Sequence, residues 1–109
     1  MKTLADFKRR IRPGVIIHGT FHRKFIGREN NECIWGDEDL GERGVSMVQS
    51  NSFALKTIRK SGEIVDSWCS FPRASQLRIL DEDTVTIMEQ DDRTKEFYPI
   101  LTYKFITTP

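Results

Sequence analysis

Apolar residues recur at helical spacing at the start of the chain and then at alternating positions over most of the remainder. The first apolar set falls on one helical face: Leu4, Phe7 and Ile11. Thr3 can cap the first turn together with Asp6, and Pro13 cannot continue a helix. The pattern predicts a short helix over about residues 3–11, which must dock on the rest of the chain because so short a helix is marginal alone.

From residue 14 onward the alternation has the period of half-buried β-strands. The first run predicts a strand that turns Ile17 and Phe21 to the core and the two histidines to the other face. The later runs predict strands within residues 44–58, bent at "QSNS", and at 65–69, 84–89 and 96–106. Residues 27–44 are polar and rich in glycine, and we expect a loop there with at most a short strand at 33–35.

Most of these strands are joined by links of hairpin length, including a turn at Ser61 and Gly62. Antiparallel strands in such number, about five to seven, prefer to curl into a small barrel or sandwich. We expect a mainly β (α+β) fold, a small, partly open barrel flanked by the helix, with Phe21, Leu55 and Tyr103 buried. The 109 residues suffice for one domain, 1–109, whose β-rich part covers about residues 14–107.

Positive charge is concentrated at the beginning of the chain. Eight of the 17 basic residues but one of the 16 acidic residues precede residue 29, a net charge there of 8 − 1 = +7. Arg9, Arg12, Arg23 and Lys24 are the candidates for a patch that binds phosphate groups. The alternative is that the basic residues pair with the acidic remainder of the chain.

The sequence offers little that is typical of catalysis or of metal binding. Cys33 and Cys69 have no further ligands at zinc spacing, and we expect them to be reduced and buried. His18 and His22 would stand about 13 Å apart on an extended strand, too far for one metal ion, and we expect both to face solvent or a partner. The acidic run 36–42 lacks the alternating spacing of a calcium loop. We therefore expect a protein that is not an enzyme, with no metal and no cofactor.

Residues 67–75, "SWCSFPRAS", bring two aromatic residues, a proline and an arginine together. Trp68 and Phe71 are three positions apart, so on an extended strand they point to opposite faces and one of them should be buried. A guanidinium over an indole can hold a ligand, which makes Trp68 with Arg73 a candidate binding lip. A structural seam of the barrel is the other interpretation.

The pattern "VQSNSFAL", a glycine turn, "SW" and "FPRAS" over Val48–Ser75 resembles small proteins of bacteriophages and other mobile elements. The opening L-x-x-F-K-R-x-I-x-P-G supports the same resemblance. It implies an accessory protein in the cytoplasm of a bacterial host that acts by binding and inhibits a defence system. The partner would be a host protein or an anionic nucleotide signal.

Further interpretations stay open at this point. A small nucleic-acid-binding barrel would contact phosphates through the basic N-terminal segment, and its affinity would fall with salt. A metal-dependent enzyme using the acidic run has no support from spacing. A homo-oligomer is compatible with the sequence, whereas no apolar run approaches the roughly 20 residues that span a bilayer.

Overall fold

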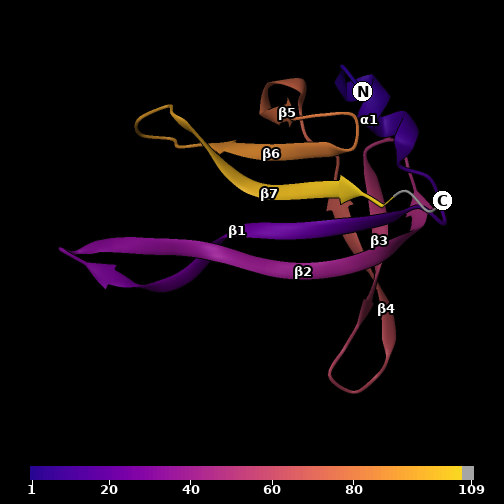
Figure 1. Ribbon diagram of the computed structural model, residues 1–109, viewed down its shortest axis with the longest axis horizontal. Coiled ribbons are helices and arrows are strands. Elements are labelled where there is room, and N and C mark those ends of the chain that lie inside the picture. The colour runs from indigo at the N-terminus through magenta and orange to yellow at the C-terminus, as the bar shows by residue number, and fades with distance from the viewer. Residues whose placement is uncertain (107–109) are drawn as a thin grey trace.

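The computed structural model describes residues 1–106 as one antiparallel seven-stranded sheet with a short helix (Figure 1). The elements are α1 (Leu4–Arg10), β1 (Ile16–Glu29), β2 (Glu32–Val48), β3 (Ser52–Ile58), β4 (Ile64–Ser70), the 3-10 turn η1 (Ala74–Gln76), β5 (Leu77–Ile79), β6 (Thr84–Gln90) and β7 (Phe97–Phe105). The strand order is β4-β3-β2-β1-β7-β6-β5, so the sheet is open between β4 and β5. This confirms the mainly β fold; residue 107, the predicted end of the β-rich part, lies outside the described residues.

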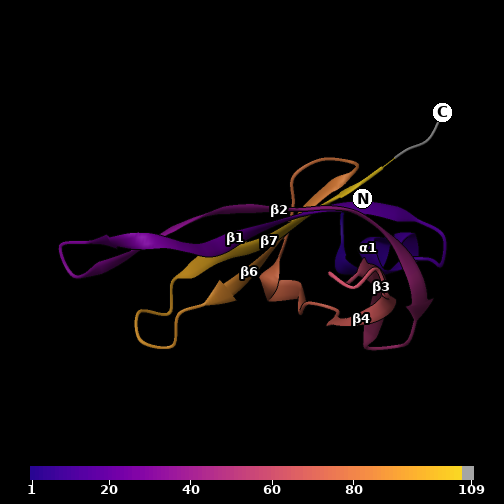
Figure 2. The same cartoon turned by 90° about the horizontal axis from the view of Figure 1, so that it is seen from below.

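The N-terminal helix forms where its capping residues predict it. The Thr3 side chain accepts the backbone N–H of Asp6, and the Asp6 carboxylate accepts the N–H of Thr3 in return. Phe7 and Ile11 are fully buried against the sheet. Figure 2 shows the reason: the sheet curls, β3 and β4 turn below the plane of β1 and β7, and α1 lies on that concave side. Among the described residues, no helix is long and apolar enough to cross a membrane.

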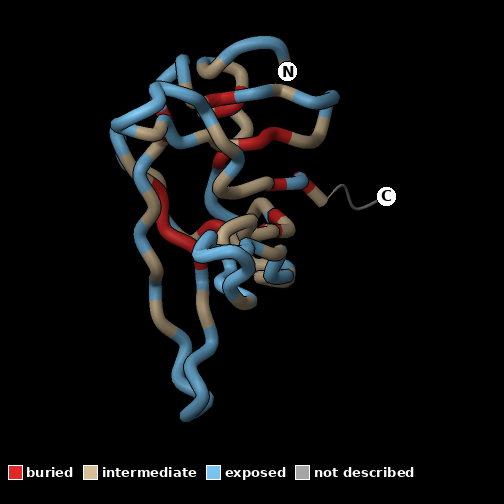
Figure 3. Tube along the Cα trace, turned by 90° about the vertical axis from the view of Figure 1, so that its left-hand side faces the viewer, coloured by how far each residue is buried: buried red, intermediate tan, exposed pale blue. Residues whose placement is uncertain are grey.

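The predicted assignment of strand residues to the core is correct near the helix and wrong farther along β1. Ile17, Leu55 and Tyr103 are buried, as the alternation predicts, and they belong to one apolar cluster with Phe105. Phe21 was expected in the same core but is only partly buried. The reason is that β1 leaves the core at about this residue and continues into solvent. In Figure 3 the buried segments accordingly gather where the elements meet, and the far end of the β3–β4 hairpin is exposed.

The prediction of a loop over residues 27–44 is wrong, because these residues form most of a long β1–β2 hairpin. Asn30 and Asn31 make its turn with φ of 51° and 64°, the left-handed pair that a tight hairpin turn requires. Three register shifts interrupt the pairing, the first where Gly41 has a φ of 72°. We call residues 22–37 the arm, since this part of the hairpin extends beyond the rest of the sheet (Figure 1).

Several smaller predictions are confirmed. Gly62 has a φ of 86° in the β3–β4 turn, "PRASQL" contains η1, and a register shift between β6 and β7 accompanies Pro99. The expectation for the cysteines is half wrong: both are free, but Cys33 is exposed near the end of the arm and Cys69 is only partly buried.

The turn between β6 and β7 depends on one carboxylate and is expected to weaken in acid. Asp91 accepts the backbone N–H groups of Thr94 and Arg93, both at 2.9 Å, and these bonds lower the pKa of Asp91. A depressed carboxyl pKa contributes stability above its unfolded value, 3.8, and that stability is lost as the pH falls through the folded pKa. The stability difference between wild type and Asp91→Asn should therefore shrink from about pH 5 to about pH 2 in thermal melts. A constant difference between wild type and Asp91→Asn over this pH range would contradict the prediction.

Candidate functional site

The residues expected to bind a ligand do not gather at one place. Arg9 and Arg12 lie at the helix end of the molecule, whereas Arg23 and Lys24 lie on the arm (Figure 1). The eight residues of β1 from Ile16 to Arg23 alone separate the two pairs by roughly 20 Å. A single basic patch would require the helix to lie beside Arg23 and Lys24. The structure separates them, so this patch is not formed.

Basic residues of the helix are instead engaged within the chain. Arg10 pairs with Asp83 at 3.0 Å and its guanidinium lies 4.3 Å from the centre of the Phe105 ring. The Lys8 ammonium lies 5.3 Å from the centre of the Phe71 ring, and Arg9 pairs with Asp6. Pairing with the acidic remainder of the chain, the alternative to a phosphate-binding patch, is therefore observed for Arg10, whereas Arg9 pairs within the helix and Lys8 contacts an aromatic ring.

The arm carries a continuous stack of aromatic rings around one arginine. The guanidinium of Arg23 lies between two rings, 4.2 Å from the centre of Trp35 and 4.4 Å from that of Tyr98 on β7. Phe25 continues the stack, edge-on to Trp35 with ring centres 5.9 Å apart. Such contacts favour a fixed orientation of the guanidinium and the rings. We call Arg23, Phe25, Trp35 and Tyr98 the arm stack.

Large apolar side chains of the arm are uncovered, both in the stack and beside it. In the stack Phe25 is 55% and Trp35 40% exposed, and beside it Ile26 is 60% and Ile34 36% exposed. Large apolar side chains that gather on a projecting hairpin, rather than scatter singly, are typical of a surface that another molecule covers. Arginine with tryptophan or tyrosine is also the composition of the residues that contribute most to binding at interfaces.

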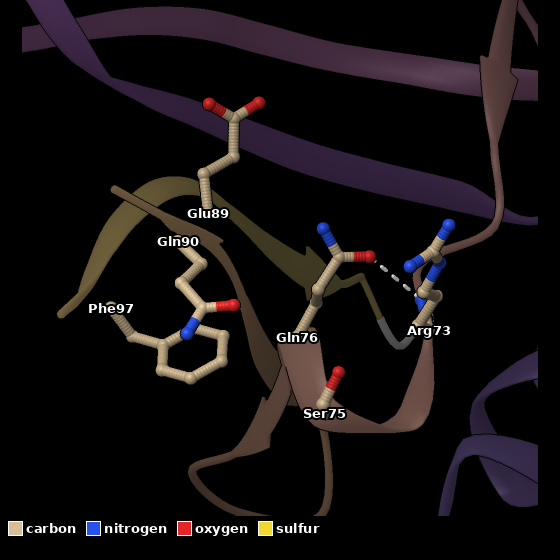
Figure 4. A pocket seen from close by; sticks show the side chains of 6 residues that line it. All are labelled: Arg73, Ser75, Gln76, Glu89, Gln90 and Phe97. Carbon is tan, nitrogen blue, oxygen red and sulfur yellow. Dashed lines mark hydrogen bonds between the residues drawn. The ribbon is translucent and has the colours of Figure 1, made fainter. Parts of the chain in front are cut away.

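A small polar pocket adjoins the arm stack through Glu89. The Tyr98 hydroxyl donates to Glu89 at 3.0 Å, a bond that raises the pKa of Tyr98. The pocket, about 290 Å³, is shown in Figure 4 between η1 on one side and the end of the β6–β7 hairpin on the other, and its lining side chains are Arg73, Ser75, Gln76, Glu89, Gln90 and Phe97.

Among residues 1–106, two polar groups of this pocket have no hydrogen-bond partner. The Gln76 carbonyl oxygen accepts the backbone N–H of Arg73 at 2.9 Å, so its amide NH₂ is left for a ligand. The Gln90 amide donates to the Lys95 carbonyl at 2.9 Å and keeps its oxygen free to accept. Together with the Arg73 charge, the pocket offers a donor, an acceptor and a cation, but the Glu89 carboxylate beside them opposes an anionic ligand.

The stretch "SWCSFPRAS" is divided between the core and the surface. Phe71 is the inward residue, with its ring centre 5.0 Å from that of Phe53 and 6.3 Å from that of Phe7. Trp68 is 47% exposed. Arg73 lines the pocket beside Phe97, and no cation–ring contact joins it to Trp68 within residues 1–106. The seam interpretation fits Phe71, whereas the expected Trp68–Arg73 platform is not formed.

The histidines, expected to face solvent or a partner, each pair with a carboxylate across the β1–β2 hairpin. His18 Nε2 lies 2.6 Å from Asp39 Oδ1, and His22 Nδ1 lies 2.8 Å from Asp37 Oδ1. The Gly41 N–H, donated to Asp39 at 2.8 Å, lowers the pKa of that carboxyl, and His18 adds to the effect. These pairs fasten the two strands together at the base of the arm.

One of these pairs continues into a chain of hydroxyl groups. His22 Nε2 lies 2.6 Å from the Thr102 hydroxyl, which lies 2.9 Å from the Thr86 hydroxyl. An acid–histidine–hydroxyl order can activate a nucleophile, but Thr102 lies in the middle of a strand paired on both sides. The ladder thereby occupies the nearby backbone N–H groups that would otherwise stabilise an oxyanion. We interpret the chain of bonds as a cross-strand network.

The sequence pattern indicated Arg23 and Lys24 by their charge but gave no sign of Trp35 and Tyr98. These two residues lie far apart in the sequence, and both contact Arg23 because β1 lies between β2 and β7.

In the described part of the chain, no three histidine, cysteine or acidic side chains are placed to share a metal ion.

Comparison with protein families, curated proteins and solved structures finds no match to this chain.

Proposed function

We propose that this chain is a non-enzymatic binding protein whose arm docks on another protein. The observation that carries the proposal is the arm itself: an ordered hairpin beyond the core whose stack of aromatic rings and arginine is left uncovered by the rest of the chain. A two-stranded ribbon contributes little stability of its own in water, so an arm of this length with large apolar side chains is expected to serve contact with a partner.

The resemblance of residues 48–75 gives this binding protein its proposed setting. We place it among accessory proteins of bacteriophages or mobile elements, with a protein of the bacterial host as its target and inhibition of a defence system as the outcome. A protein target fits the arm better than an anionic nucleotide does, because the pocket that holds Arg73 also holds the Glu89 carboxylate. A nucleic-acid target is less favoured because the basic residues lie at two ends of the molecule.

The test identifies the partner first and then asks whether the arm binds it. Tagged protein captures partners from lysates of candidate hosts, and the identified protein is purified for calorimetry with Ile26→Ser, Ile34→Ser and wild type. Each arm variant should bind about tenfold more weakly, since an exposed isoleucine that becomes buried on binding contributes about 1.5 kcal/mol. Ile58→Ser is the matched control, because Ile58 is also an exposed isoleucine but lies on the β3–β4 hairpin.

The same preparations can overturn the proposal. Equal affinity for all four proteins would remove the arm from the interface. Nucleotide released by heating the purified protein, and lost in Arg73→Ala, would favour sequestration of a nucleotide in the pocket. Turnover of a nucleotide or nucleic acid that a single substitution abolishes would show that the protein is an enzyme.

A further inference from the structure

The edge of the sheet at β4 has the properties of a pairing surface, independently of the arm. β4 is the terminal strand, and all seven of its residues pair with β3 without a register shift. The opposite edge, β5, has only three residues. Soluble proteins usually protect a long edge with proline, bulges or several charges, whereas "IVDSWCS" has no proline and one charged residue, Asp66.

The backbone bonds show which groups face the open edge. Phe71 donates its N–H to Asn51 at 3.0 Å and Arg59 donates to Glu63 at 2.9 Å, which fixes the alternation of the β3–β4 ladder. The odd-numbered residues of β4 therefore bond to β3. The N–H and carbonyl groups of the even-numbered residues point away from the sheet: Ile64, Asp66, Trp68 and Ser70.

We propose that two copies of this chain associate by antiparallel pairing of their β4 edges, with Trp68 opposite Trp68 of the second copy. A two-fold axis at this position makes Trp68 a hydrogen-bonded pair with its equivalent, because its N–H and carbonyl both point outward. It also places Asp66 opposite Ser70 of the second copy, so that the carboxylate faces a hydroxyl donor.

The side-chain pairs favour this register over those with an axis at Asp66 or at Ser67. A two-fold axis at Asp66 would place two carboxylates directly opposite each other, which is unfavourable. An axis at Ser67 would place the carboxylate opposite an indole. The axis at Trp68 brings the two indoles together instead, and aromatic cross-strand pairs are among the more favourable ones.

The side chains beside Trp68 complete the contact. Trp68 lies opposite Ala54, which in turn lies opposite Met47, so an apolar row crosses three strands and ends at the free edge. Met47 and Trp68 are both exposed in the single chain, whereas Ala54 between them is fully buried. Because the β3–β4 hairpin projects from the sheet in Figure 1, a second hairpin can approach this row.

Disulfide trapping tests the register. In the proposed pairing Ser67 lies opposite Cys69 of the second copy in a non-hydrogen-bonded pair, with Cα atoms about 4.5 Å apart, within the range a disulfide bridges. Ser67→Cys in a Cys33→Ser background should give a covalent dimer on mild oxidation that reductant dissolves. Val65→Cys in the same background is the matched control and should give no covalent dimer, because its opposite residue is Phe71.

Sedimentation tests the association itself. Wild type at about 100 µM should be dimeric, and Trp68→Lys, which sets two like charges opposite each other, should weaken the dimer at least about tenfold. Ile58→Lys introduces the same charge at an exposed residue of β3, which is not the edge strand, and should leave the dimer unchanged. A monomeric wild type, a dimer indifferent to Trp68→Lys, or a dimer that Ser67→Cys does not trap would each overturn the proposal, and none of these results bears on binding through the arm.

Discussion

Replacing Phe7 by alanine should lower the free energy of unfolding by about 3–5 kcal/mol, the usual cost of truncating a buried phenylalanine. Phe7 is fully buried, and its ring centre lies 5.9 Å from that of Phe105 and 6.3 Å from that of Phe71. Alanine would leave a cavity where the helix packs against β7 and against the residue that follows β4. Urea unfolding followed by circular dichroism measures the change.

Phe25→Ala supplies the matched control, because it makes the same chemical change on the arm. Phe25 is exposed, so its truncation should cost less than about 1 kcal/mol. Equal losses for the two variants would contradict the packing described here, since they would mean that the arm is as important to the fold as the core. The comparison also separates the two parts of the molecule: a body held together by Phe7 and an arm that the fold does not require.

The parts of the fold that could be predicted are those where one face of an element is buried. Leu4, Phe7 and Ile11 repeat at helical spacing because only one side of α1 meets the sheet. Leu55 and Tyr103 could likewise be assigned to the core because polar residues alternate with them along their strands. In both cases only one face of the element is buried, so its apolar residues repeat at the period of a helix or of a strand.

The arm could not be predicted because it has no buried face. Both of its faces meet solvent, so residues 27–37 show no alternation and their glycine and polar content is typical of a loop. Its turn, Asn30-Asn31, lacks the glycine that usually marks a hairpin. Each register shift adds one extra residue to one of the two strands. After each shift, the side chains of that strand exchange the faces of the hairpin to which they point.

The candidate site illustrates the limit of reasoning from charge alone. Arg23 was selected as a phosphate contact, but its guanidinium lies between Trp35 and Tyr98, where it orders the stack. Tyr98 comes from the last strand of the sheet, and its place beside Arg23 depends on β1 pairing with both β2 and β7. Strand order is a tertiary property, so no local pattern could have joined these residues.

Trp35→Ala should have the largest effect on the proposed binding, weakening the partner complex about 30-fold or more, as for a tryptophan that contributes at least about 2 kcal/mol to an interface. The truncation removes the exposed indole and also the ring that holds Arg23 on one side and Phe25 on the other. Both would then sample more orientations in the free protein, and ordering them again would reduce the affinity further. Calorimetry with the purified partner measures the loss, and circular dichroism should show an unchanged melting transition.

Ile58→Ala is the control for this prediction, since Ile58 is exposed but lies on β3, away from the arm and from the β4 edge. Its affinity for the partner should stay within about twofold of wild type, because surface residues outside the contact contribute little. An affinity that falls equally in Trp35→Ala and Ile58→Ala would place the interface elsewhere, because then the arm would have no special role in recognising the partner.

Arg23→Lys refines the result, because it keeps the charge but replaces the planar group that stacks on Trp35 and Tyr98. An intermediate loss of affinity in this variant indicates that stacking rather than charge orders the arm.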